Sequence, residues 1–90
     1  MPYIKKEDRK KFDSVIEDVV DALTEHGFKP VSVGELNYVI SKIIWGIFDK
    51  NPSYTIGNNF LGTLTAVQLE FYRRKLGPYE DVKIKENGDI

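Results

Sequence analysis

Apolar residues recur every three or four positions between residues 7 and 26, and this spacing most constrains what the chain can fold into. The apolar positions are Phe12, Val15, Ile16, Val19, Val20 and Leu23. On a helix they share one side, while acidic residues such as Asp13 and Glu17 take the other. Gly27 is placed to end the helix in a left-handed cap, and Pro30 prevents an early restart. The pattern predicts a helix over 7–26.

A second helix is predicted over 33–50. Ser32 can cap its N-terminus by accepting a hydrogen bond from the backbone N–H of Glu35, and Asn51-Pro52 ends it. The apolar positions follow at helical spacing and cover about half of its circumference. They are Leu36, Val39, Ile40, Ile43, Ile44, Ile47 and Phe48.

A third helix is predicted over 55–76, where Gly77 would supply a C-terminal cap and Pro78 would enforce the stop. Its main stripe consists of Ile56, Phe60, Leu64, Val67 and Phe71. Residues near the centres of the three stripes should be largely buried. These are Ile16, Val20, Ile40, Ile43, Leu64 and Val67.

Three amphipathic helices with short connections predict a mainly α fold, a three-helix bundle in one small domain over residues 1–90. The two ends are predicted to be extended, from Tyr3-Ile4 and from the tail 78–90. One alternative pairs them as a small two-stranded ribbon lying on the helices, and the other is a frayed terminus.

Charge and cysteine content narrow the class of protein. The net charge is −1, so no overall field attracts nucleic acid or an anionic membrane, and there are no cysteines. No apolar run reaches the roughly 20 residues of a membrane span. These features favour a cytoplasmic protein without a membrane segment. Residues 31–70 carry only five charges, which predicts that the middle of the chain is buried.

The residues that could carry catalysis do not form a recognisable set. His26 is the only histidine, and no partner that would orient it as a general base follows from the spacing. The glycine-containing stretches GELNYVI and GNNFLG lack the ending of a phosphate-binding loop. We therefore predict no catalytic, cofactor-binding or metal-ligating residues and no cofactor.

Candidate interaction residues lie on the second and third helices and in the tail. Tyr38 and Trp45 occupy a second face of their helix, where they meet either the tail or another chain. The cluster Arg73 to Lys75 could touch phosphate, although cations are also expected in a last helical turn. Apolar residues of the tail could anchor it. The candidates are Tyr38, Trp45, Tyr72, Arg73, Arg74, Tyr79, Val82 and Ile84.

Several phrases are characteristic in combination: MPYI before Glu7-Asp8, GELNYVI at 34–40, LEFYRR at 69–74 and PYEDVKIKENGDI at 78–90. Together they resemble a family of small uncharacterised proteins of bacteria, archaea and bacteriophages. The resemblance covers about half of the chain and implies no activity. It indicates that the tail belongs to the protein.

The sequence favours a non-enzymatic interaction or accessory protein that forms a homo-oligomer and binds an unidentified protein partner. One alternative is a small nucleic-acid-binding regulator that uses Arg73 to Lys75 and the tail lysines, although the diluted charge argues against it. Another is an enzyme whose site forms between subunits. Its residues would be Asn37, Tyr38, His26 or Glu70.

Overall fold

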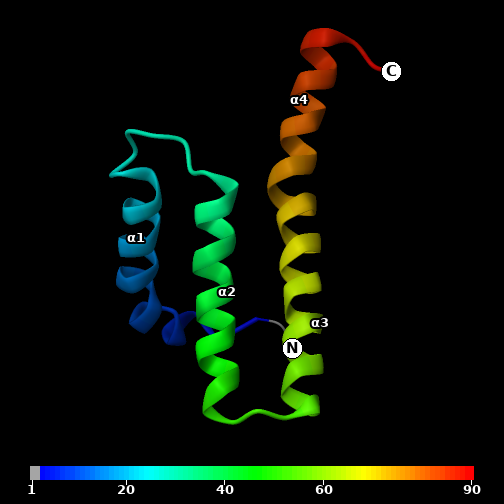
Figure 1. The fold of residues 1–90 in the computed structure, drawn as a ribbon. Coiled ribbons are helices and arrows are strands. Elements are labelled where there is room, and N and C mark those ends of the chain that lie inside the picture. The colour runs from blue at the N-terminus through cyan, green and yellow to red at the C-terminus, as the bar shows by residue number, and fades with distance from the viewer. Residues whose placement is uncertain (1–2) are drawn as a thin grey trace. The chain divides into compact units, whose positions relative to one another are not determined.

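Two helical units make up the computed structural model of the chain, which describes residues 3–90. The first unit ends at Pro52 and the second begins at Ser53. All regular structure within residues 3–90 is helical (Figure 1), which confirms the mainly α class. The elements are η1 (Lys6–Asp8), α1 (Lys10–Thr24), α2 (Val33–Lys50), α3 (Tyr54–Phe71), η2 (Tyr72–Leu76) and α4 (Gly77–Asn87).

The first unit contains α1, which is shorter at both ends than the helix predicted over 7–26. The single 3₁₀ turn η1 precedes it. Its C-terminus comes early because two non-glycine residues adopt left-handed conformations, Glu25 at φ 49° and His26 at φ 59°. Gly27 is left-handed as expected, at φ 89°, but it lies beyond the end of the helix. The Thr24 hydroxyl donates to the Val20 carbonyl at 2.8 Å and closes the last turn.

The start of α2 is fixed by the predicted cap. The backbone N–H of Glu35 donates to Ser32 Oγ at 3.1 Å. Lys29 Nζ, on the connection from α1, donates to Glu35 Oε1 at 3.0 Å. The chain runs along α1 and returns along α2, so the two helices are antiparallel (Figure 1). They meet at a shallow hollow of about 320 Å³ lined by Leu23 of α1 and Val39 of α2.

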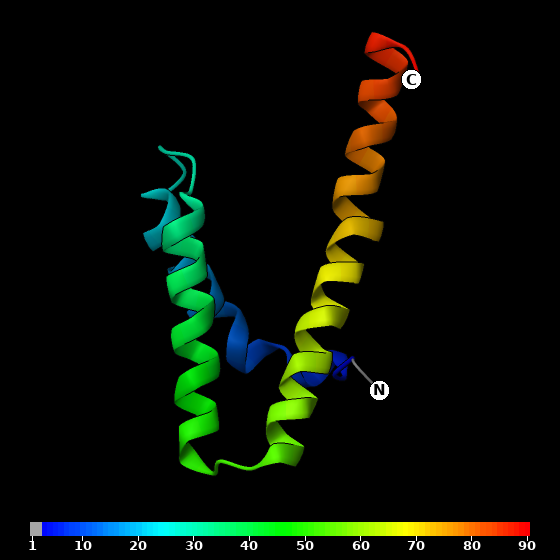
Figure 2. The ribbon, with the colours of Figure 1, turned by 45° about the vertical axis from the view of Figure 1, so that its right-hand side comes forward.

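The second unit is one helical run from Tyr54 to Asn87, formed by α3, η2 and α4 in succession (Figures 1 and 2). Ser53 caps its start by accepting a hydrogen bond from the Ile56 backbone N–H at 3.1 Å. Gly88, at φ 87°, ends it, and its N–H donates to the Ile84 carbonyl at 2.8 Å. The elements of this unit contact the elements next to them along the chain.

The prediction of an extended tail is wrong, because residues 77–87 form α4. Gly77 adopts right-handed helical angles, φ −56° and ψ −54°, and not the left-handed cap expected of it. The turn Tyr72–Leu76 is a π turn, in which the Gly77 N–H bonds to the Tyr72 carbonyl five residues back. This wide turn precedes Pro78, which then occupies the first turn of α4, where a missing N–H costs little.

The expected terminal ribbon does not form within residues 3–90, which contain no strand. Tyr3 and Ile4 are without regular structure, and Lys5 has extended backbone angles. The spacing of apolar residues in the tail is compatible with a helix, because Tyr79 and Val82 are three residues apart.

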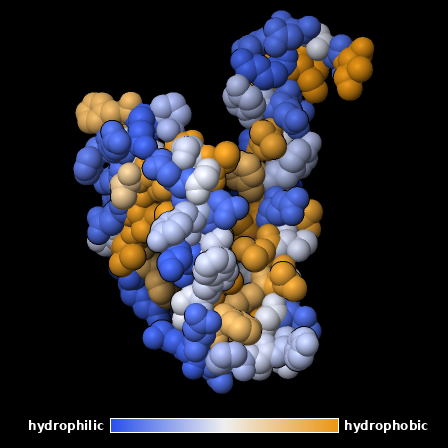
Figure 3. Space-filling model, in the orientation of Figure 1, coloured by the Kyte–Doolittle hydropathy of each residue, from blue (hydrophilic) through white to orange (hydrophobic). Residues whose placement is uncertain are grey.

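The predicted burial of the stripe centres is not shown, because neither unit buries them by itself. No described residue is buried, and the stripe centres remain 36–59% exposed. The six are Ile16, Val20, Ile40, Ile43, Leu64 and Val67. Figure 3 shows hydrophobic side chains at the surface over α1 and α3. The spacing identified which residues share a helix face, but burial also needs a surface that covers that face.

Candidate interaction site

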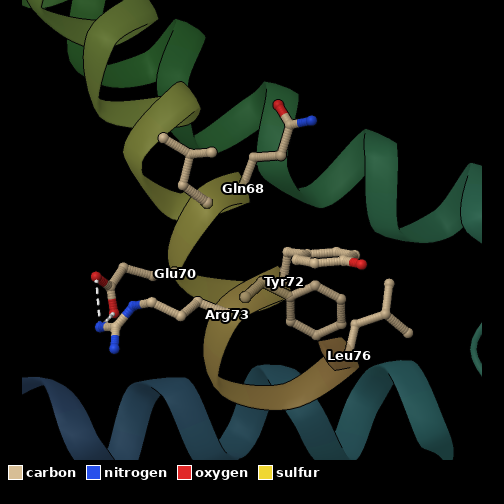
Figure 4. A pocket seen from close by; sticks show the side chains of 7 residues that line it. Gln68, Glu70, Tyr72, Arg73 and Leu76 are labelled. Carbon is tan, nitrogen blue, oxygen red and sulfur yellow. Dashed lines mark hydrogen bonds and ion pairs between the residues drawn. The ribbon is translucent and has the colours of Figure 1, made fainter. Parts of the chain in front are cut away.

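The π turn η2 separates the candidate residues of the second unit into two groups. Figure 4 shows Glu70 and Arg73 on one side of the helix, with Tyr72 and Leu76 on the other. A π turn holds more residues per turn than an α-helix, so it rotates the side chains after it relative to those before it. Such turns are frequent at functional sites.

A hydrogen bond between Tyr72 and Glu80 joins the π turn to α4. The Tyr72 hydroxyl donates to Glu80 Oε1 at 2.6 Å, across eight positions of the chain. The hydrogen bond to this carboxylate, together with its negative charge, raises the pKa of Tyr72 above the usual range of a tyrosine. Tyr72 is therefore held as a neutral donor that ties α4 to the preceding turn.

Arg73 and Arg74 share one acidic partner. Arg73 donates to both carboxylate oxygens of Glu70, at 3.0 and 3.1 Å, and Arg74 lies 3.7 Å from Glu70 Oε2. The arginine side chains are 69% and 63% exposed, so these ion pairs lie in solvent and are weak. The shared carboxylate reduces the positive field that a phosphate backbone would meet.

An open, mostly apolar hollow of about 600 Å³ lies beside the turn, with Leu69, Phe71, Tyr72 and Leu76 among its lining residues. It belongs to one helical run, and its wall is a helix surface rather than an enclosed cleft. Aromatic and aliphatic side chains in an exposed hollow are suited to a packed protein partner.

The remaining tail candidates lie on α4. Tyr79, Val82 and Ile84 are 58%, 52% and 43% exposed. Lys83 Nζ lies 5.6 Å from the centroid of the Tyr79 ring, within the range of a cation–π contact. Tyr79 and Ile84 also line a second open hollow, of about 860 Å³, that extends to the end of the chain.

The α2 candidates occupy different surroundings. Tyr38 lines the hollow between α1 and α2, with Val19, Ala22 and Leu23 opposite, and Lys42 Nζ lies 5.9 Å from its ring centroid. Trp45 is 60% exposed. Tyr38 therefore lines the hollow beside α1, and Trp45, seven positions further along the same helix, lies on the same side of α2.

The residues considered for an enzyme between subunits each have local partners. His26 Nδ1 lies 3.7 Å from Asp21 Oδ2, Asn37 accepts a hydrogen bond from Ser41, and Glu70 binds the arginines. None of these contacts brings one of the candidates to another. Within residues 3–90 there is no group of three or more side chains that could hold a metal ion.

The sequence indicated that Glu70 and Glu80 weaken the positive field of the basic cluster, but it did not predict which residues they pair with. Glu70 precedes Arg73 and Arg74 by three and four positions, the spacing of neighbours on a helix, and that signal was available. Glu80 follows Tyr72 by eight positions, and only the continuation of the helix through Pro78 brings the two together.

In the part of the chain that the structure describes, no helix is long and apolar enough to cross a membrane. Among family models, the domain of unknown function DUF6899 matches residues 1–90. No curated protein and no solved structure matches the chain.

Proposed function

This chain belongs to the DUF6899 family, and we propose that it is a self-associating interaction protein that acts by assembly and not by catalysis. The observation that carries this proposal is the exposure of its apolar side chains. No described residue is buried, and exposed large hydrophobic residues occur on every α-helix. Soluble monomers rarely expose contiguous apolar surface on this scale, and large exposed apolar patches mark sites of association.

The composition of the second unit supports the same proposal. It consists of one helical run, so it contains no second element to cover its apolar side chains. Helices in proteins gain most of their stability by packing an apolar face. Tyr54 to Leu69 carry no charge, and interface centres are depleted of charged residues. The basic residues that follow then contribute to a polar rim.

Light scattering coupled to gel filtration tests the proposal. At micromolar concentration we expect a mass of at least twice 10.4 kDa. A parallel titration with duplex DNA and single-stranded RNA at low and moderate salt tests the nucleic-acid alternative, which requires affinity that falls steeply with salt. A monomer mass at every concentration would overturn self-association, and salt-dependent binding by a monomer would favour the alternative.

A further inference from the structure

We propose that Asn87 is a deamidation site, at which the backbone nitrogen of Gly88 attacks the side-chain amide, and that the C-terminal cap of α4 sets the rate of this reaction. Every group involved belongs to the end of one helix, so the reaction is independent of the proposed self-association. Its product is a permanent chemical change at the end of α4.

The residue pair Asn87-Gly88 is the first support, because it is the one Asn-Gly pair among the five asparagines of the chain. The following nitrogen must approach Cγ of the asparagine, and a Cβ on the following residue hinders that approach. Gly88 has no Cβ. Asn51 precedes Pro52, whose nitrogen carries no hydrogen. The other three lie inside helices and precede residues with side chains; they are Asn37, Asn58 and Asn59.

The reaction needs no co-reactant except water. The Gly88 nitrogen loses its proton and forms a bond to Cγ of Asn87, while the bond from Cγ to Nδ2 breaks and the side-chain nitrogen leaves as ammonia. The product is a five-membered succinimide. Water then opens this ring at one of its two carbonyls and gives aspartate or isoaspartate. The net change consumes one water and releases one ammonia, without oxidation or reduction.

The cap of α4 is the second support, because it engages the attacking nitrogen. The Gly88 N–H donates to the Ile84 carbonyl at 2.8 Å, which keeps its proton in the hydrogen-bond pattern of the helix. Gly88 also adopts φ 87°, a left-handed value that favours glycine. The residue that ends the helix is therefore the one whose nitrogen reacts. Attack must begin from molecules in which the last turn has opened.

The products weaken the cap that controls their formation. Deamidation places a carboxylate at the C-terminus of α4, where the helix dipole is already negative, and Asp89 lies two positions further on. Isoaspartate also lengthens the main chain between Asn87 and Gly88, which disturbs the hydrogen bond to Ile84. Ile84 lines the open hollow at the end of the chain, so the change reaches a candidate interaction residue.

Incubation of the full chain at mildly alkaline pH, followed by digestion and mass spectrometry, tests the proposal. The folded protein and the chain in urea are compared over the same period. We expect conversion at Asn87 in both, slower in the folded protein by about 2- to 10-fold, the factor by which one hydrogen bond lowers the open population. Chromatography against synthetic peptides separates aspartate from isoaspartate.

The matched control is Asn87→Gln. It keeps a neutral amide, but its additional methylene requires a six-membered ring, so we expect no conversion at position 87 over this period. An Asn87 that stays intact in the folded protein while the unfolded chain converts would overturn the proposed site. Equal rates in the folded and unfolded chains would overturn control by the cap.

Amide hydrogen exchange measures the effect of the product on α4. Asn87→Asp carries the charge of the aspartate product, and we expect exchange at Lys85 and Glu86 to rise by about 2- to 5-fold, the effect of one charge at a helix terminus. Asn87→Gln should exchange as the wild type does. If Asn87→Asp leaves exchange at these amides unchanged, the modification does not open the end of α4.

Discussion

Gly77 has little room for a side chain. A Cβ at this position would lie 3.1 Å from the Tyr72 carbonyl oxygen, because the π turn brings that oxygen close. Around Gly62, in the middle of α3, nothing lies within 4 Å of the corresponding Cβ. The two glycines therefore offer a matched comparison within one helical run.

We expect Gly62→Ala to raise the free energy of unfolding by about 0.5–1 kcal/mol, the usual gain from replacing a helical glycine. Gly77→Ala should give no such gain and should lower the stability, since its new methyl group crowds the Tyr72 carbonyl. Urea denaturation of both variants measures the difference. Equal stabilisation by the two substitutions would show that the π turn does not constrain Gly77.

Glu35 and Lys29 form the ion pair that joins the connection after α1 to the start of α2, at 3.0 Å. The hydrogen bond from Lys29 and its positive charge lower the pKa of Glu35, and the same hydrogen bond raises the pKa of Lys29. Because the pKa of the Glu35 carboxyl is lower in the folded than in the unfolded chain, the pair stabilises the fold at any pH above the pKa of the unfolded chain. This stabilisation is lost as the pH falls through the pKa of the folded chain. Because the pKa of Lys29 is higher in the folded than in the unfolded chain, its charge stabilises the fold at any pH below the pKa of the unfolded chain. This stabilisation is lost as the pH rises through the pKa of the folded chain.

The urea midpoint of the wild type should therefore fall as pH is lowered from about 5 to about 3. Glu35→Gln should remove part of this dependence, whereas Glu17→Gln removes a carboxylate from α1 and should leave that part intact. Because the pair lies in solvent, added salt should shrink the difference. Identical pH profiles for the wild type and Glu35→Gln would contradict a stabilising role for the pair.

At the scale of the elements, α4 depends on its connection to η2. The hydrogen bond from Tyr72 to Glu80 crosses this connection, and Lys83 and Glu86 form a further pair at 3.2 Å within α4. An isolated helix of 11 residues is marginal in water. Contacts that tie α4 to the preceding turn should therefore decide how far it frays.

Tyr72→Phe removes the hydroxyl that binds Glu80 and keeps the ring. We expect faster amide hydrogen exchange in α4, at Val82 to Lys85, with exchange in α3 unchanged. Tyr79→Phe removes a hydroxyl about two turns further on and serves as the control. If the two variants exchange alike in α4, the bond to Glu80 does not hold that helix.

The sequence predicted some of the helices and their caps, but it did not predict that the last helix continues through Gly77 and Pro78. Apolar spacing and the Ser32 cap follow from local chemistry, and both the helical class and that cap are confirmed. Gly77-Pro78 was interpreted as a stop because each residue alone commonly ends a helix. The π turn before them lets the helix continue, and hydrogen bonds five residues apart leave no simple signature in the residue pattern.

At the scale of the whole molecule, the sequence predicted which residues share a face but not what covers them. Ile43 and Val67 are stripe centres, yet they are 51% and 59% exposed. A helical stripe needs an opposing surface, and a pattern of 3.6 residues states nothing about where that surface comes from. We propose that another copy of the chain covers these apolar faces, so that folding and association are coupled.

Thermal unfolding at a series of protein concentrations tests this coupling most directly. If the core is completed between copies, mass action requires the unfolding midpoint to rise with protein concentration. We expect that rise from low to high micromolar wild type, and we expect it to be weakened in Ile43→Glu. A single cooperative midpoint that stays constant across the series, in a chain that remains monomeric, would contradict assembly as the source of the missing burial.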